Sequence, residues 1–583
     1  MLASSSKGHP RLFLNETRLH RLKVLADEDP VLASLAENLQ RQADSLLAAE
    51  PTAFQIVGPR MLKNCQQILN RVATLLLVYR MTGIQRYKER ALDELKSAAA
   101  FPHWNPDHFL DTAELCTAFG IAYDWLLPST SREETAFIRN ALIDKGLRVG
   151  LQAYSDKAWW LEHRFNWNNV CHGGLSIGAL AVADEEPALA DAILSTAVEK
   201  LPLSLANYEP DGAWQAGPDY WEYTTWYTAL FIDALQTALG DDFRLKTPGL
   251  AKTGHFPIHC TGPAGMYFNF ADAAVESKAK PSLFWLGGQF GRPELIHENH
   301  RLLQKQVHAD EEFHPFNLVW YQSDDQPVPE LPTSVLFKGP ETVFLRSRWN
   351  DPDAFFIGFK GGSNQADHGH LDIGSFVLDA FGTRWAADLG RDDYDLPGYW
   401  DGKEGGGRWK YFRLNNKSHN TLTLNDDVQR ADAVAPIVRH SFLEEKSFAV
   451  MDLTAAYSPH AKSVIRGIAL TQDGTVIVQD EIDWAGDERK ISWNLLTDAL
   501  IDCLDGKAEL FKSGKTLHVS IVSPSGAEFS VATATQAPPE ERNDGYRRLQ
   551  VHFHAPPGRT VLCVVISARP NRKADVAPLQ GWR

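Results

Sequence analysis

The sequence predicts a protein of two domains, a ring of helix hairpins followed by an antiparallel β-sandwich. The spacing of its apolar residues changes near residue 310, from the threes and fours of helices to the twos of strands. Its 583 residues also exceed the roughly 250–300 that one hydrophobic core usually accommodates. We therefore expect a helical domain over residues 1–310 and a β-sheet domain over residues 311–583.

The first half has the pattern of amphipathic helices. Apolar residues recur at spacings of four and three from Cys65 to Tyr79, and this stripe predicts a helix that ends near Thr82 and Gly83. Short separators such as Pro128-Ser129-Thr130 join the predicted helices, as in antiparallel hairpins. Further helices are expected at about 109–127, 131–153, 165–183, 186–206 and 216–238.

The second half has the pattern of strands with one buried face. Apolar and polar residues alternate over 516–521 and again over 549–554. No helical segment alternates with these runs, so the sheets should be antiparallel and stacked as a sandwich. The border is expected within 306–335, where Asp324 to Pro332 is rich in acidic residues and proline.

Charge and hydropathy exclude several function classes. Lys and Arg total 58 against 74 Asp and Glu, and the net charge of −16 repels nucleic acid and anionic membranes. No apolar run reaches the roughly 20 residues that cross a bilayer. The first residues do not form a secretion signal, and the compartment stays open: periplasmic or secreted if a signal was removed, otherwise cytoplasmic. The oligomeric state stays open.

Histidines and carboxylates gather in two neighbouring stretches, residues 361–394 and 411–426. Imidazole with carboxylate is ligand chemistry that suits zinc or another first-row divalent ion. The simpler interpretation is a polar strand face, which we assign to a second pair, His552 and His554. The first cluster consists of His368, His370, Asp372, Asp388 and His419.

Two further clusters lie in the helical half. Asn168 and His172 are four residues apart and share a helix face. Tyr220, Tyr223 and Tyr227 follow the same helical spacing. Taken alone, each cluster is better explained by packing than by catalysis, because aromatic stripes and amide hydrogen bonds are common between helices.

Five motifs link these clusters: NWNNV, DGAWQAGPDYWEY, HGHLDIGSF, RWAADLG and SHNTL, in this order. With them the chain resembles the heparinase II/III-like polysaccharide lyases, from residue 9 to its end, and is most similar to the broad-specificity glycosaminoglycan lyases. The resemblance implies a helical (α/α) toroid followed by an antiparallel β-sheet domain. It also implies cleavage of uronate-containing polysaccharides by β-elimination, in a cleft between the two domains.

The resemblance assigns roles on the β-side. It places a metal triad on His370, Asp388 and His419, and a catalytic histidine on His368. In an ideal strand His368 and His370 would share a face about 6.6 Å apart, from two rises of roughly 3.3 Å, so geometry alone would let both bind metal. We expect one divalent ion, zinc before manganese or calcium, in a mainly structural role, because β-elimination needs no hydrolytic water.

On the helical side, the resemblance places the group that neutralises the substrate carboxylate within Asn168, Asn169 and His172, with Asn168 preferred. The catalytic tyrosine is Tyr223, 55 residues after Asn168, or Tyr220, from its place in the GPDY motif, and this choice stays open. Residues in or beside the motifs are expected to bind substrate: Asn169, Trp214, Gln365 and Arg413.

The expected partner is an acidic polysaccharide, with no nucleic acid and no membrane. We favour a glycosaminoglycan such as hyaluronan, chondroitin or heparan sulfate over alginate. One rival is a glycoside hydrolase that uses Asp219 and Glu222 as its two acids. The others are a cupin-type oxygenase that uses the histidines, and a carbohydrate-binding protein without catalysis.

Overall fold

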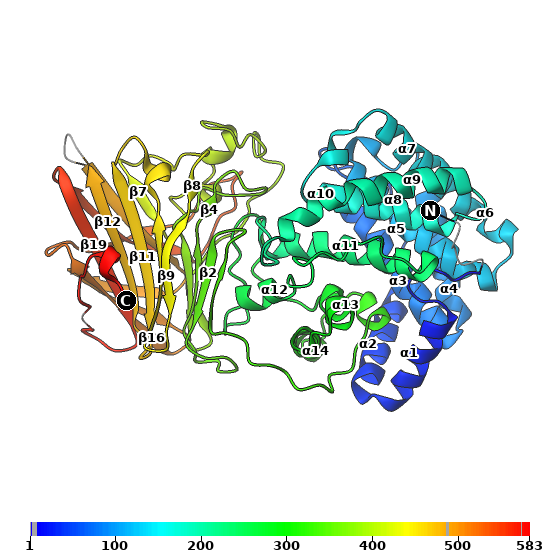
Figure 1. Cartoon of the computed structure of the whole chain (residues 1–583), viewed down its shortest axis with the longest axis horizontal. Coiled ribbons are helices and arrows are strands. Elements are labelled where there is room, and N and C mark those ends of the chain that lie inside the picture. Colours follow the sequence, from blue (N-terminus) through cyan, green and yellow to red (C-terminus); the bar gives the residue numbers. More distant parts are fainter. Residues whose placement is uncertain (1, 3–7, 485–488, 573) are drawn as a thin grey trace. The chain divides into compact units, whose positions relative to one another are not determined.

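The computed structural model describes every residue except 1, 3–7, 485–488 and 573 (Figure 1). The chain forms two compact units, each built from more than one stretch of sequence. The helical unit comprises Met1–Glu209, Glu222–Gly254 and Lys278–Pro329. The β-unit comprises Pro210–Trp221, His255–Ser277 and Glu330–Arg583.

The helices lie in the order that the sequence predicts, with α12 in the β-unit and α11 divided between the two units. They are α1 (Glu16–Glu28), α2 (Pro30–Leu46), α3 (Leu62–Thr82), α4 (Gln85–Ala100), α5 (Phe109–Leu126), α6 (Arg132–Ala141), α7 (Arg148–Ser155), α8 (Asn166–Ala181), α9 (Pro187–Lys200), α10 (Pro202–Leu205), α11 (Gly217–Leu239), α12 (His255–Cys260), α13 (Pro281–Phe290), α14 (Pro293–His308) and α15 (Phe316–Val319).

Helix α5 is the centre of the helical unit. All of its residues are buried, and it packs against α3 and α8. A helix that is buried all round needs neighbours on every side, which is the position α5 occupies. The predicted helix over 65–79 is confirmed as α3, and it ends where Gly83 adopts the left-handed conformation, at φ 76°.

The strands form antiparallel sheets, as predicted. They are β1 (Ser334–Phe337), β2 (Thr342–Arg346), β3 (Phe356–Lys360), β4 (Gly362–Ser363), β5 (Phe376–Ala380), β6 (Thr383–Ala386), β7 (Leu422–Leu424), β8 (Val434–Ala435), β9 (Ile437–Phe442), β10 (Lys446–Asp452), β11 (Ser463–Thr471), β12 (Val476–Trp484), β13 (Arg489–Thr497), β14 (Leu500–Leu504), β15 (Lys507–Lys512), β16 (Lys515–Ser523), β17 (Phe529–Thr533), β18 (Arg547–Ala555) and β19 (Gly558–Ser567).

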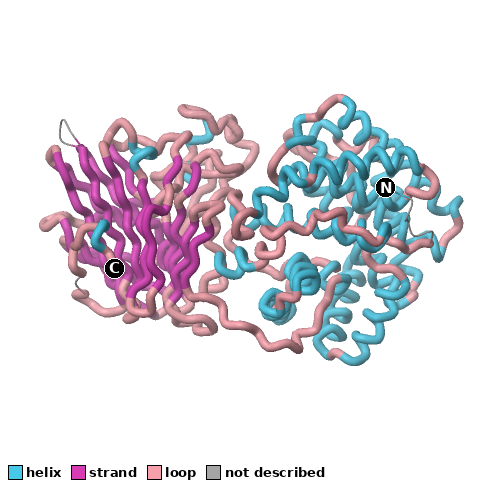
Figure 2. Tube along the Cα trace, in the orientation of Figure 1, coloured by secondary structure: helices cyan, strands magenta, loops and turns pink. Residues whose placement is uncertain are grey.

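Three of these sheets share one hydrophobic core. Their strand orders are β1-β2-β3-β5-β6, β14-β15-β16-β19-β12-β11-β10-β9 and β17-β18-β13-β7, and a small fourth sheet pairs β4 with β8. Figure 2 shows the long strands of this unit side by side, joined by loops. The alternation near 517 and 549 is confirmed: Leu517 and Val519 on β16, and Leu549 and Val551 on β18, are buried in this core.

The border between the units lies at Pro329/Glu330, within the predicted range 306–335 but later than residue 310. Residues 311–329 stay with the helices because Trp320 donates to Asp233 at 2.9 Å and Tyr321 donates to Asp29 at 2.7 Å. The earlier stretch 255–277 joins the β-unit, where Arg384 on β6 donates to the Tyr267 carbonyl at 3.0 Å. Such long-range partners cannot be found from the period of the sequence.

None of the helices in the described part of the chain is both long enough and apolar enough to span a membrane.

Candidate active site

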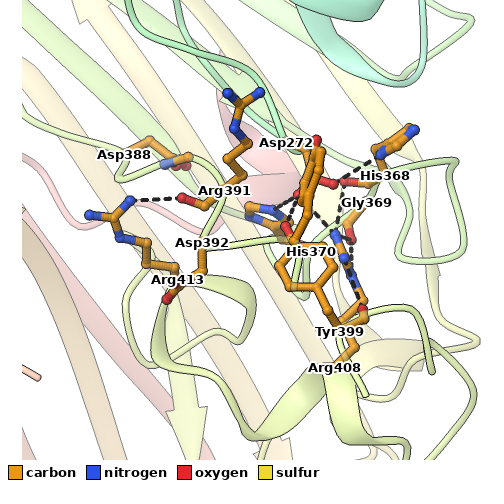
Figure 3. Close-up of polar contacts among 12 residues, drawn as sticks. Asp272, His368, Gly369, His370, Asp388, Arg391, Asp392, Tyr399, Arg408 and Arg413 are labelled. Atoms are coloured by element: carbon orange, nitrogen blue, oxygen red, sulfur yellow. Dashed lines mark hydrogen bonds and ion pairs between the residues drawn. The ribbon is translucent and has the colours of Figure 1, made fainter. Parts of the chain in front are cut away.

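A buried carboxylate, Asp272, organises the polar cluster of the β-unit (Figure 3). His368 Nδ1 lies 2.9 Å from its Oδ2, while His370 Nε2 lies 2.9 Å from its Oδ1. Tyr399 donates to Oδ1 at 2.7 Å and Arg408 at 3.0 Å. Four donors from two loops, the β4–β5 and β6–β7 connections, thus converge on a carboxylate from an earlier stretch of sequence.

The charge of Asp272 determines the tautomers of both histidines. Burial alone would raise the pKa of Asp272, but the Arg408 guanidinium and the two imidazole hydrogen bonds hold that pKa well below its ordinary value. An ionised carboxylate only accepts hydrogen bonds, so His368 donates from Nδ1 and His370 from Nε2. In the neutral imidazole, the lone pair of His368 is therefore on Nε2 and that of His370 is on Nδ1.

His368 lies in a loop and not on a strand, so the predicted strand geometry of the HGH motif is wrong. Residues 364–375 connect β4 to β5 without regular structure. His368 itself has a φ of +57°, in the left-handed region that a residue with a Cβ adopts at a cost of about 1–2 kcal/mol. The hydrogen bond to Asp272 and the neighbouring rings hold this conformation.

Tyr220, in the first turn of α11, stacks on the His368 imidazole. The ring centroids are 3.7 Å apart and the planes differ by 17°. Its hydroxyl lies 2.8 Å from the hydroxyl of Tyr394. Burial, with the nearby Tyr394 and Asp272, raises the pKa of Tyr220 well above its ordinary value, so its phenol keeps its proton at neutral pH.

Tyr223, the other candidate tyrosine, belongs to the helical unit. Its hydroxyl donates to Glu114 at 2.8 Å, and Tyr227 donates to the same carboxylate at 2.6 Å. Burial raises the pKa of Glu114, although the hydrogen bonds from both tyrosines oppose this rise. Within its own unit, then, Tyr223 is part of a buried hydrogen-bond network, whereas Tyr220 contacts the predicted catalytic histidine.

The predicted metal ligands lie together in the β-unit. The rings of His370 and His419 are 5.4 Å apart, and His419 Nδ1 lies 3.0 Å from Asp388 Oδ2. Among the described residues, His370 Nδ1 and His419 Nε2 are buried without a hydrogen-bond partner. Two unpartnered ring nitrogens are donors of the type that zinc binds.

Both carboxylate oxygens of Asp388, the third predicted ligand, already have partners within the protein. One of its oxygens faces His419 and the other accepts from the Gly390 amide at 2.8 Å. The described residues contain no group of three or more histidine, cysteine or acidic side chains that could hold a metal ion as they stand. These residues therefore have the donor atoms that bind zinc, but in this geometry they do not form a ligand group of three.

The predicted residues of α8 are occupied by internal hydrogen bonds. Asn168 donates from Nδ2 to the carbonyls of Leu161 at 3.2 Å and Lys200 at 3.4 Å. Asn169 donates to Thr228 at 2.8 Å and accepts from Ser204. Both amide hydrogens of Asn168 are used in these bonds, and its role in binding a carboxylate stays a prediction.

His172 is a buried structural histidine in this geometry. Its Nδ1 lies 2.7 Å from the Tyr154 hydroxyl, and its Nε2 lies 3.2 Å from the Leu161 carbonyl. Burial lowers the pKa of His172 to about 4. The ring is then neutral at pH 7, so the structure does not support an imidazolium that neutralises a carboxylate.

The other predicted substrate-binding residues differ in their exposure. Trp214 is fully buried, so its ring is not available for stacking on a sugar. Gln365 is exposed in the His368 loop. Arg413 donates to the Arg391 carbonyl and to Asn543, each at 2.7 Å, so it fixes neighbouring segments (Figure 3).

Sequence reasoning missed Asp272, Tyr394 and Tyr399. Asp272 lies 96 residues before His368, in the segment FADAA, which has no motif that points to it. It also missed Asn166, which is buried and whose Oδ1 has no partner in the described part of the chain. A spacing signal did exist here, since Tyr220 follows Asn166 by 54 residues, nearly the interval from Asn168 to Tyr223.

The comparisons with known proteins agree with this architecture. The family described as "Heparinase II/III-like, C-terminal" matches residues 346–572, which include His368 and all three predicted metal ligands. Residues 346–572 are therefore similar to the C-terminal domain of the heparinase II/III-like family. No curated protein sequence matches the chain.

Solved structures match over nearly the whole length of the chain. A crystal structure of heparinase III has a TM-score of 0.63 at 14% identity, covering 95% of this chain and 92% of that one. A mutant heparan sulfate lyase from Pedobacter heparinus has a TM-score of 0.61 at 13% identity, covering 96% and 92%. At this identity the matches establish the fold, and the predicted toroid followed by a β-sandwich is confirmed.

Proposed function

We propose that the protein is a polysaccharide lyase that cleaves a uronate-containing polysaccharide by β-elimination. The family of residues 346–572 and the fold shared with heparinase III support this class. The observation that carries the proposal is the Tyr220–His368 pair, in which a phenol and an imidazole stack at 3.7 Å with the imidazole anchored on Asp272.

The pair supplies the acid and the base that β-elimination needs. His368 Nε2 takes the proton from C5 of the uronate, and the electrons of that C–H bond form the C4–C5 double bond. The C4–O4 bond breaks, and the Tyr220 hydroxyl gives its proton to O4. Proton exchange with solvent then returns His368 and Tyr220 to their starting states, so no other reactant is consumed.

The environments of the two side chains favour His368 as the base and Tyr220 as the acid. Asp272 keeps the imidazole proton on Nδ1, which leaves the Nε2 lone pair for the substrate. The raised pKa of Tyr220 disfavours a phenolate, so this residue suits the acid better than the base. An amide that offsets the charge developing on the uronate carboxylate would contribute roughly 2.7–4 kcal/mol, and Asn168 stays the predicted residue for this role.

A divalent metal, zinc before manganese or calcium, remains part of the proposal. His370 and His419 would supply ring nitrogens and Asp388 a carboxylate oxygen. When bound, such an ion would crosslink the β4–β5 and β6–β7 connections and so stabilise the segment that holds His368.

The substrate class is proposed to be a glycosaminoglycan, with alginate as the alternative. The matched structures with the same fold over the full chain include heparinase III and a heparan sulfate lyase, which supports the first choice. The test is a panel of hyaluronan, chondroitin sulfate, heparan sulfate and alginate, scored for unsaturated products by the ultraviolet absorbance of the new double bond. Products without this absorbance would indicate a hydrolase, and binding without products would indicate a non-catalytic protein.

A further inference from the structure

One loop of the β-unit, residues 390–406, carries side chains that the proposed chemistry does not use. It supplies Tyr394 to Tyr220 and Tyr399 to Asp272. Two other residues of this loop, Arg391 and Trp400, are exposed to solvent. We infer that Arg391 and Trp400 form a binding subsite for an anionic sugar ring next to His368, an inference that rests on the proposed function.

Trp400 is held rigidly while half of its surface stays open. Its ring is 5.0 Å from that of Tyr394, 5.2 Å from that of Tyr399 and 5.6 Å from that of His368, to which it is nearly perpendicular at 84°. Yet 53% of Trp400 is exposed, whereas Trp214 and Trp221 are fully buried. An exposed aromatic face whose orientation is fixed offers an apolar platform for the C–H face of a sugar.

Arg391 supplies a positive charge beside the same rings. Its guanidinium carbon lies 5.2 Å from the centroid of the Tyr394 ring. Burial alone would lower the pKa of Arg391, but Tyr394, Tyr220 and the Asp219 carboxylate hold that pKa above its ordinary value, so the side chain is cationic. Arg413 fixes the Arg391 backbone by donating to its carbonyl, as Figure 3 shows.

Two neighbouring carboxylates make hydrogen bonds of their own. Asp272 accepts from four side chains. Asp392 accepts from the backbone amides of Asp393 at 2.8 Å and Glu541 at 3.1 Å. In a chain with a net charge of −16, an exposed arginine beside the proposed catalytic pair is a local attraction for an acidic sugar.

The ligand chemistry is an anionic group on a sugar ring, either the carboxylate of a uronate or a sulfate. A guanidinium binds a carboxylate or a sulfate in a bidentate manner, so Arg391 would suit either group. The experiment below distinguishes the two. The subsite would hold a sugar of the chain beside the ring that reacts, and it would discriminate acidic from neutral polymers.

The test measures affinity by titration calorimetry in a His368→Ala background, where bound polymer is not consumed. The variants are Arg391→Gln, Arg391→Lys, Trp400→Ala and Trp400→Phe. Lys403→Gln is the matched control, because Lys403 is an exposed cation of the same loop that pairs loosely with Asp401 at 3.6 Å. Thermal melting of each variant verifies that it folds, and the conservative substitutions remain informative if Trp400→Ala does not.

The expected result is a loss of affinity of roughly tenfold or more for Arg391→Gln, the size of one charge-assisted hydrogen bond, and a smaller loss for Arg391→Lys. Trp400→Ala should weaken binding while Trp400→Phe keeps most of it, and Lys403→Gln should bind as the parent does. A loss on both hyaluronan, which has no sulfate, and heparan sulfate identifies a carboxylate. A loss on heparan sulfate alone identifies a sulfate.

Two outcomes separate failure of this inference from failure of the proposed function. If the unmodified enzyme yields unsaturated products but Arg391→Gln and Trp400→Ala bind within twofold of their parent, the subsite is refuted and the lyase stands. If no polymer yields unsaturated products, the proposed function fails, and the binding series still decides the subsite. Absence of binding to every polymer overturns both.

Discussion

The two units use the same residue types in opposite ways. In the helical unit, His172, Asn168 and Tyr223 make hydrogen bonds to backbone carbonyls and to buried side chains of that unit. In the β-unit, His368 Nδ1 bonds to Asp272, and its Nε2 lies 3.8 Å from Asp367. The partners of a polar side chain, more than its type, indicate whether it serves the fold or the reaction.

The strongest test of this comparison replaces each of the two tyrosines by phenylalanine. Tyr220→Phe and His368→Ala should each lower kcat by roughly 10²–10⁴-fold, the usual contribution of a general acid or base. Tyr223→Phe should keep kcat within a few-fold and instead lower the free energy of unfolding by about 1–3 kcal/mol, because Glu114 loses a buried donor. If steady-state kinetics instead showed a large loss of kcat for Tyr223→Phe and a small one for Tyr220→Phe, the catalytic tyrosine would be Tyr223.

Asp272→Asn tests the centre of the β-unit cluster. The neutral amide can donate to the histidines, so it no longer keeps their protons in place, and we expect kcat to fall at least about tenfold with KM little changed. Loss of the charge also leaves the buried Arg408 unpaired, at a cost of about 3–5 kcal/mol in unfolding free energy.

Asp367→Asn is the matched control for that substitution. Asp367 lies 3.8 Å from His368 Nε2 and is partly exposed. It should change kcat and stability far less than Asp272→Asn. Equal effects of the two substitutions on kcat would show that Asp272 has no special role in positioning His368.

Removal of the predicted metal should lower stability and activity together. After dialysis against a chelator, the melting temperature should fall by several degrees and turnover by about tenfold or more, because the ligand loops lose their crosslink. His419→Ala should reproduce both effects and remove the bound metal from elemental analysis. An apoprotein that keeps its melting temperature but loses turnover would contradict a mainly structural ion.

The smallest effect concerns the pH dependence of stability. Burial lowers the pKa of His172 from 6.5 to about 4, so the folded state favours the neutral ring. Its contribution is complete above pH 6.5 and is lost as the pH falls toward 4, by about 3 kcal/mol in total. His259 and His314, whose pKa values burial lowers to about 3, act in the same direction.

His172→Gln should flatten this dependence, measured as the urea midpoint between pH 7.5 and pH 5. The slope should decrease without vanishing, because His259 and His314 remain. A slope identical to that of the parent would mean that His172 is not buried in its neutral form, and the contrast between the two units would lose its clearest example.

The sequence predicted most of the architecture and only part of the site. The period change found both kinds of domain, because burial of one face imposes the period of each element. The HxH pair at His552 and His554 was correctly interpreted as exposed on a strand, while the catalytic role of His368 stays a prediction. Local pattern was sufficient in these cases.

It was not sufficient where a partner comes from far along the chain. Asp272 reaches His368 because residues 255–277 fold into the β-unit, which no spacing indicates. Helical spacing placed Tyr220 and Tyr223 on one face and could not choose between them, because the choice depends on which ring meets the imidazole. Trp214 is of a residue type that often stacks on sugars, but it is buried, because tertiary packing determines its exposure.

The most direct test of the central claim is digestion of the polymer panel in water labelled with oxygen-18, followed by mass spectrometry of the products. β-Elimination transfers no water oxygen, so the account predicts unlabelled fragments that carry a C4–C5 double bond. These products should disappear in His368→Ala. Saturated fragments that carry one oxygen-18 at the new reducing end would show hydrolysis and would contradict the account.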